Sequence, residues 1–567
     1  MKKLIALFLS TVLFSCSQQT PADMIISGGT IYTSEASQPT VEAVAILGDS
    51  IIFAGSKADA ENYKGGKTQM IDLQGKTMTA GFIEGHGHIM GLGYNEMNLD
   101  LMYVKSYDEL VAKVKEAVDK AQPGQWIIGR GWHQDKWEIK PKKMVKGFQT
   151  HQPLSEVSPN NPVFLSHASG HAGFANQKAM QIAGVNQLSV EQLSQDLHDS
   201  GEILKDENGN PTGIFNERAQ GLIRKYVPEN TPETDAQALD LAIKACHRNG
   251  ITSFQDAGTS QNYIDLFKKF RAEGNLGIRL YTMLTGGDEE LMKTWFNSGP
   301  EIDARGQLTI RSIKLHCDGA LGSRGAWLLE PYTDRPDHYG HETYPMDLVY
   351  SISQKALQTG FQVCSHAIGD RANKEILDRY EKAFNESPDK AKNSRFRIEH
   401  AQHLHLDDIP RFGKLGVIPA MQAVHLSSDR PWAIDRLGEK RIVDGAYVWR
   451  KLLETGAVIV NGTDVPVEPI NPIASFYASV TRKTLAGQPE GGYEADQKMT
   501  REEALKSYTL DAAFGAFEEK IKGSIKRGKL ADFTVFNKDI MKVTESELLT
   551  TTVAMTIVGG KVVYDWK

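Results

Sequence analysis

The stretch Gly81-Phe-Ile-Glu-Gly-His-Gly-His88 is a short apolar run that ends in two histidines. Similar runs recur along the chain, separated by longer helical patterns such as residues 234–249 and 374–385. This alternation is typical of βα units and a parallel sheet. The further runs are residues 250–256, 277–283, 311–318, 360–366, 395–400, 416–422 and 456–464. With the first run they make eight, the number that closes a (β/α)8 barrel, so we predict an α/β TIM-like barrel over residues 80–519.

Two segments outside this pattern predict the rest of the architecture. Residues 24–79 and 520–567 both read as short strands with turns, so we expect the two chain ends to complete one composite β-sandwich. Residues 89–249 are too long for one βα connection. We therefore predict that they form an insertion after the first barrel strand, a lid or subdomain over the barrel mouth.

The N-terminus has the pattern of an export signal. Lys2 and Lys3 precede an apolar run that ends at Ser15, which is shorter than the about 20 residues needed to span a bilayer. Leu13-Phe-Ser-Cys16 resembles a bacterial lipoprotein box, so we predict a signal peptide at 1–15, lipidation of Cys16 and a polar tether at 16–23. The protein would then lie in the cell envelope, held to the membrane only by this lipid. An ordinary secretory signal with an incidental cysteine is the alternative.

Composition excludes several partners and site types. The 567 residues carry 64 Lys and Arg against 71 Asp and Glu, a net charge of −7 without long runs of one sign, so no nucleic-acid surface is expected. Apart from Cys16 the chain has three cysteines and no CxxC spacing, which argues against a disulfide framework or a cysteine-rich zinc site. A metal would therefore need histidine and carboxylate ligands. Assembly into a homo-oligomer stays open.

Metal-binding residue types follow the predicted strands at the ends where barrel active sites are built. His86 and His88 are two apart and face the same way, and three other runs end in a similar manner at His366, His400 and Asp464. Lys314 lies within the fourth run. Taken singly, the histidines could be ordinary polar residues and the lysine a buried ion-pair partner. Beside cations, a neutral lysine could instead react with carbon dioxide to form a carbamate that bridges two metals.

Several blocks resemble the amidohydrolase superfamily, and within it the branch of YtcJ-like hydrolases and N-substituted formamide deformylase. The blocks are residues 314–324, 365–370, 398–402 and 462–467, and the resemblance covers nearly the whole mature chain. It implies two divalent cations, expected to be zinc, and a carboxylated Lys314. The ligands it implies are His86, His88, Lys314, His366, His400 and Asp464. Glu84 stands where an aspartate is commoner, which leaves its role open.

The resemblance also implies a reaction, hydrolysis of a non-peptide amide bond in a small molecule. A hydroxide bridging the two cations would attack the carbonyl, and Asp464 would take its proton and pass it to the leaving nitrogen. A lactonase or phosphotriesterase could use the same centre, and a metal-containing binding lipoprotein is the non-catalytic alternative. A mononuclear deaminase is disfavoured because it would not need Lys314 and would be expected to have a glutamate close to His366.

Substrate contacts are predicted on weaker patterns. His167 and His171 lie in the insertion, and Asp318, Arg324 and Asp370 follow barrel strands, so all five are candidate substrate-binding residues or supports for the metal ligands. The insertion also carries Arg130, Trp132 and Trp137, which could line an aromatic wall, but the two tryptophans fit a subdomain core better. His316 shares the face of Lys314 and could contact either ligands or substrate. Three further histidines are left out of the predicted site: His403, His405 and His425. Polar surface positions explain His403 and His405 better, and support of the metal ligands stays open as the alternative.

Overall fold

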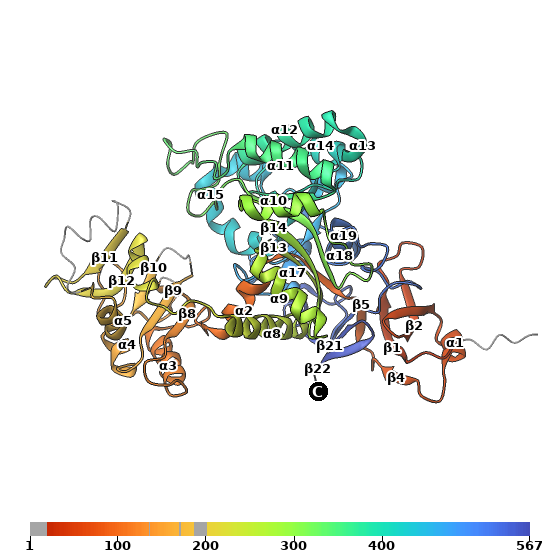
Figure 1. Ribbon diagram of the computed structural model, residues 1–567, viewed down its shortest axis with the longest axis horizontal. Helices are drawn as coiled ribbons and strands as arrows, with labels where there is room; N and C mark the ends of the chain where they lie inside the picture. Colours follow the sequence, from red (N-terminus) through yellow and green to blue (C-terminus); the bar gives the residue numbers. More distant parts are fainter. Residues whose placement is uncertain (1–19, 135–136, 169–171, 186–200, 567) are drawn as a thin grey trace, which may run out of the picture.

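The computed structural model describes residues 20–134, 137–168, 172–185 and 201–566. Cys16, the expected signal peptide and His171 lie outside the described residues, so lipidation and export stay predictions. Within the described residues no helix is both long and apolar enough to cross a bilayer. Figure 1 shows a central barrel with the insertion on one side and the sheet of the two chain ends on the other.

Eight parallel strands form the central barrel sheet, in chain order around the sheet. Every one of the eight apolar runs in the sequence overlaps one of them. The strands are β6 (Phe82–Gly87), β13 (Ile251–Thr259), β14 (Arg279–Thr285), β15 (Leu308–His316), β16 (Gln362–Ala367), β17 (Arg397–His400), β18 (Ile418–Met421) and β19 (Val460–Asn461). The TIM-like barrel predicted from the sequence is thereby confirmed.

The barrel closes where the loop after β19 meets β6. The Asp464 N–H donates to the His86 carbonyl at 2.8 Å, and the His88 N–H donates to the Val465 carbonyl at 2.8 Å. Glu84 adds a side-chain link, because its carboxylate accepts hydrogen bonds from the backbone N–H and the hydroxyl of Thr463, at 2.6 and 2.9 Å. The first and last strand ends are therefore held side by side.

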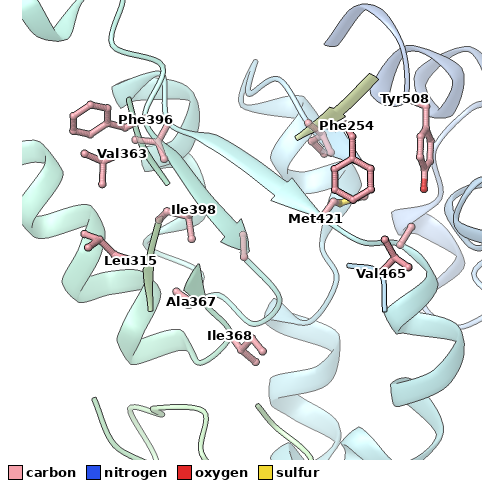
Figure 2. Packing of buried hydrophobic residues seen from close by; sticks show 14 of the residues in the cluster. Phe254, Leu315, Val363, Ala367, Ile368, Phe396, Ile398, Met421, Val465 and Tyr508 are labelled. Carbon is pink, nitrogen blue, oxygen red and sulfur yellow. The ribbon is translucent and has the colours of Figure 1, made fainter. Parts of the chain in front are cut away.

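Helices cover the outside of the barrel because alternate strand residues are apolar and face outward. Figure 2 shows part of the resulting core, including Leu315, Val363 and Ile398 from three neighbouring strands. The helices that follow in the chain are α2 (Ile89–Met97), α8 (Pro232–Arg248), α9 (Gln261–Ala272), α10 (Glu289–Ser298), α11 (Met346–Thr359), α12 (Asp370–Glu386), α13 (Pro388–Ala391), α14 (Ile409–Leu415), α15 (Val424–Gly445), α16 (Trp449–Glu454), α17 (Pro472–Thr481), α18 (Arg501–Ser507), α19 (Leu510–Gly515) and α20 (Glu545–Leu548).

The insertion between α2 and α8 has a sheet and an apolar core of its own. Trp132 and Trp137 are buried in that core, in agreement with the interpretation preferred from the sequence. The sheet order is β11-β12-β10-β9-β8-β7. The elements are β7 (Leu99–Asp100), α3 (Tyr107–Val118), β8 (Ile127–Trp132), α4 (Gln152–Val157), β9 (Val163–His167), β10 (Ala172–Ala175), α5 (Gln177–Ile182), β11 (Gly201–Lys205), β12 (Pro211–Glu217) and α7 (Gly221–Arg224).

Both chain ends contribute to a third sheet, as the short-strand patterns at the two termini predicted. The bounds are β1 (Met24–Tyr32), β2 (Thr40–Leu47), β3 (Ser50–Gly55), β4 (Gln69–Asp72), β5 (Thr77–Ala80), β20 (Phe533–Phe536), β21 (Val553–Val558) and β22 (Lys561–Asp565), with α1 (Lys57–Ala60) after β3. Hydrogen bonds join all eight strands in one sheet, and β5 pairs with β20 across the two chain ends. The two-layered sandwich stays a prediction.

A buried ion pair connects this terminal sheet to the barrel. Arg279, the first residue of β14, donates from Nε and Nη2 to the two carboxylate oxygens of Asp532, at 2.7 and 3.0 Å. Both side chains are buried, and Asp532 also accepts a hydrogen bond from the Gly559 N–H at 2.7 Å. Removing one partner would leave a charge in the interior without compensation.

We expect Asp532→Asn to lower the free energy of unfolding by about 3–5 kcal/mol, since Arg279 keeps its charge in a buried place. Urea unfolding followed by tryptophan fluorescence measures this change. The matched control is Asp49→Asn, which breaks the exposed pair of Asp49 with Arg305 and should cost less than about 1 kcal/mol. Equal losses in the two variants would contradict the role given to the buried pair.

Candidate metal centre

The six predicted ligands line one cavity at the C-terminal ends of the barrel strands. Its volume is about 680 Å³, which suits a small molecule. His86 lies one residue before the end of β6, His88 precedes α2, and Asp464 lies in the loop after β19. The other three, Lys314, His366 and His400, come from the adjacent strands β15, β16 and β17. Residues spread over almost four hundred positions therefore share one cavity.

Three of these residues form the tightest group. Ligand atoms of His86, His400 and Asp464 lie within 4.8 Å of one another, a spacing that could hold one metal ion. Asp464 Oδ1 lies 3.6 Å from His86 Nε2 and 3.2 Å from His88 Nε2. Burial opposes ionisation of Asp464, but the neighbouring His425 and His88 hold its pKa well below the usual range. The carboxylate is thus an anionic ligand for a cation.

Lys314 points into the same group. Its Nζ lies 3.1 Å from His86 Nε2, and the side chain is buried. Burial lowers the pKa of the amine, because a charged ammonium is costly away from water. The neutral amine is the form that reacts with carbon dioxide, so the position meets the chemical requirement for a carbamate.

The hydrogen bonds of His86 and His400 leave one nitrogen of each ring for a metal. The Glu399 carboxylate accepts from His86 Nδ1, and Gln422 Oε1 lies 2.7 Å from His400 Nδ1. The Gln422 amide nitrogen donates to the Ala420 carbonyl at 3.1 Å, which turns its oxygen toward His400. Both rings therefore carry the proton on Nδ1 and keep an Nε2 lone pair that can accept a metal, although in His86 this lone pair faces Lys314 Nζ at 3.1 Å. Burial lowers the pKa of His86 to about 4, which keeps that ring neutral at pH 7.

His366 completes the histidine cluster. Its ring centroid lies 4.4 Å from that of His400 and 5.0 Å from that of His316. His366 Nε2 and Asp464 Oδ1 are buried and make no hydrogen bond of good geometry with the described residues. Buried polar atoms that make no well-formed hydrogen bond are costly, and a cation would satisfy both. The donor set of imidazole and carboxylate suits zinc.

The backbone at His400 and Asp464 is unusual. Their φ angles are +73° and +59°, in the left-handed region that non-glycine residues seldom adopt. In β17, Ile398 faces the helices and Glu399 faces the barrel interior, so simple alternation would turn His400 outward. The positive φ brings its ring back beside His86 and His366. Such local strain is typical of functional sites.

Glu84, whose role the sequence left open, acts on the backbone next to the ligands. Its carboxylate is fully buried and binds Thr463, the residue before Asp464. Burial raises the pKa of Glu84 to about 8. Glu84 therefore connects strand β6, which carries His86, to the loop that carries Asp464.

Asp318, Arg324 and Asp370 make contacts within the barrel loops. The Asp318 carboxylate accepts hydrogen bonds from the N–H groups of Trp327, Ile368 and Gly369, and one oxygen lies 3.3 Å from His366 Nε2. Arg324 pairs with Asp334 at 2.7 Å, and Asp370 accepts from the Leu329 N–H at 2.9 Å. These contacts hold loops around the cavity, and substrate binding by the three residues stays a prediction.

The insertion reaches the cavity through His133. The His133 ring lies 4.5 Å from the ring of His167, one of the predicted substrate-binding residues, and His133 lines the cavity with the metal ligands. His167 packs edge to face against Trp132, with centroids 4.7 Å apart. The insertion thus adds to the cavity wall, while its action as a lid stays a prediction.

Besides Gln422, the sequence analysis missed two residues that touch the predicted ligands. His425, left out of the site there, is buried in α15, and its Nε2 lies 3.6 Å from Asp464 Oδ2. Burial alone would lower the pKa of His425, but the carboxylates of Asp464 and Glu468 raise it to about 10. Glu399 was also missed, although it directly precedes His400. Neither residue ends a predicted strand, the signal that identified the ligands.

The pocket wall combines polar and aromatic groups. His316, which shares the face of Lys314, lines the cavity above it. The other wall residues include Gln402, Asp429, Trp432 and Glu468. His403 is buried outside this cavity, so the surface position expected for it was wrong, whereas His405 is exposed as expected.

Comparisons with known proteins agree with this geometry. The chain is 32% identical over 550 residues to the putative amidohydrolase YtcJ of Bacillus subtilis, covering 95% of this chain and 98% of the relative. It is 26% identical over 558 residues to the N-substituted formamide deformylase of Arthrobacter pascens, covering 96% and 98%. A solved structure described as an uncharacterized metal-dependent hydrolase from Pyrococcus furiosus matches with a TM-score of 0.72 and 28% identity, over 92% of this chain and all of that one.

The family comparison covers most of the chain. A family model described as the amidohydrolase family matches residues 69–564, which include all six predicted ligands. The resemblance to the amidohydrolase family that was inferred from the sequence blocks is confirmed. The protein belongs to the amidohydrolase family.

Proposed function

We propose that this metal-dependent hydrolase cleaves a non-peptide carbon–nitrogen bond, an amide, in a small molecule. The observation that carries the proposal is the convergence of His86, His400 and Asp464 within 4.8 Å, with Lys314 Nζ 3.1 Å from His86 Nε2. The relative from Arthrobacter pascens, named as a formamide deformylase, supports the choice of an amide bond.

The cavity residues would hold two divalent cations, expected to be zinc. Imidazole from His86, His88, His366 and His400 and the carboxylate of Asp464 supply ligands of the type that zinc prefers. The Lys314 amine would add to carbon dioxide with loss of one proton, and the carbamate would supply two further oxygens. Its buried position and lowered pKa favour this reaction.

When bound, the metals would lower the pKa of a water molecule and polarise the substrate carbonyl. Asp464 would accept the proton that this water loses on attacking the carbonyl carbon, and would return it to the nitrogen as the carbon–nitrogen bond breaks. Its Oδ2 lies 3.6 Å from His425, which keeps the carboxylate oriented across the cavity. The wall residues around Trp432 and His133 would enclose the rest of the substrate.

Lys314→Ala and Asp464→Asn should each lower turnover about 10²–10⁴-fold, because each removes a metal ligand and the second also removes the proton acceptor. Initial rates of the zinc-loaded enzyme on N-formyl and N-acyl amines measure this effect. His405→Ala is the control, since His405 is an exposed histidine that does not line the cavity. Wild-type rates in either ligand variant would refute the proposed centre.

Metal content should be close to two zinc ions per chain, as measured by elemental analysis after dialysis. Chelation should abolish activity and added zinc should restore it, because the histidine and carboxylate groups cannot activate water without a cation. Carbon-13 bicarbonate should give one carbamate signal in the NMR spectrum that Lys314→Ala lacks. One zinc per chain without a carbamate signal would contradict the two-metal centre.

The bond type is tested separately by comparing amides, lactones and organophosphate triesters as substrates. We expect the highest kcat/KM for amides, since Asp464 is placed to protonate a poor nitrogen leaving group. All three classes can use the same polarised centre, so the comparison must use enzyme with equal zinc content. A preference for lactones or triesters would overturn the amide assignment while leaving the metal centre intact.

A further inference from the structure

A buried ion pair lies behind the metal ligand His86. We infer that Arg397 and Glu399 are positioning residues that fix the His86 ring with its Nε2 toward the metal and thereby set the metal affinity of the site. The inference rests on the ligand role proposed for His86. Because it concerns metal binding, it is tested without reference to which bond the enzyme cleaves.

The contacts of Glu399 connect the guanidinium to the imidazole. Arg397 Nε donates to Glu399 Oε1 at 2.7 Å, and Arg397 Nη2 donates to Glu399 Oε2 at 2.8 Å. The same Oε2 accepts the hydrogen bond from His86 Nδ1. Arg397 and Glu399 have no exposed surface and His86 is 1% exposed, so no water competes for these bonds. One carboxylate thus orients the ring while the guanidinium fixes the carboxylate.

Arg397 is itself anchored on two other strands. Its Nη2 also donates to the Gly85 carbonyl at 2.8 Å, in the strand that carries His86, and its Nη1 donates to the side-chain oxygen of Gln255 in β13. The planar guanidinium has its donors in a fixed arrangement, so these contacts leave it a single orientation. The position of His86 relative to β17 is therefore determined by side chains as well as by the barrel backbone.

The energetic cost of this arrangement points to a function beyond stability. Burying an ion pair costs desolvation free energy, and apolar residues of similar volume often stabilise a protein as well or better. A carboxylate behind a ligating histidine, in contrast, fixes the tautomer and raises the basicity of the ring as a ligand. His400 has a neutral partner in the same place, Gln422. Of these two ligands, only His86 therefore has an anionic support.

The test is the zinc affinity of Glu399→Gln, measured by competition with a chromophoric chelator. This substitution keeps the side-chain shape but removes the negative charge, and we expect zinc binding to weaken about 10–100-fold. The matched control is Asp532→Asn, which breaks another buried arginine–carboxylate pair, the one between Asp532 and Arg279. The control should lower thermal stability and leave zinc affinity within twofold of wild type.

A second variant keeps the test informative if Glu399→Gln does not fold. Glu399→Asp retains the charge beside Arg397 but shortens the reach to His86, so zinc affinity should fall to an intermediate value. Nitrogen-15 NMR of histidine-labelled wild-type protein adds a direct readout. We expect the His86 proton on Nδ1, and we expect the chemical shift of His86 Nε2 to change when zinc binds. The His86 signal is assigned by its loss in His86→Gln.

The outcomes separate this inference from the proposed function. Weakened zinc binding in the Glu399 variants supports the inference, whatever the substrate, if the Asp532→Asn control keeps its zinc affinity. Wild-type zinc affinity in both Glu399 variants, with lowered thermal stability, would overturn it and leave a purely structural ion pair. A wild-type protein that binds no divalent cation would overturn the proposed function together with the inference.

Discussion

The contact between the first and last strand ends of the barrel is the constraint on which the site depends. His86 and Asp464 are far apart in the chain but adjacent in space, because the Asp464 N–H donates a hydrogen bond to the His86 carbonyl at 2.8 Å. Glu84 strengthens the same junction through Thr463. Without this closure, the strands would carry the same ligand types but no common centre.

The interior of the barrel at this level is polar, which is costly unless each group has a partner. The partners form a connected set: Glu399 binds His86 and Arg397, Gln422 binds His400, and Asp318 binds three backbone N–H groups. The left-handed backbone at His400 and Asp464 adds strain at two of the predicted ligands. The surrounding contacts hold these strained residues in one arrangement, which leaves ligand atoms converging on the cavity.

Much of the fold could be predicted from local sequence patterns. All eight apolar runs became barrel strands, and the long segment after the first run became an insertion with its own core. The strand-end rule also located the candidate ligands. The same rule missed Glu399, whose carboxylate lies inside the barrel one residue before His400, and His425, which lies in a helix. Strand alternation places Glu399 and His400 on opposite faces, and only the positive φ of His400 brings both inside.

The order of strands and helices, the ligand types and their strand ends were determined by the sequence itself, because apolar periodicity and residue chemistry act over short stretches of chain. The pairing of His86 with Glu399 and the approach of His425 to Asp464 were decided only by the tertiary structure. The physical reason is that these contacts join residues dozens to hundreds of positions apart. Their distances depend on barrel closure and side-chain direction, which no local pattern specifies.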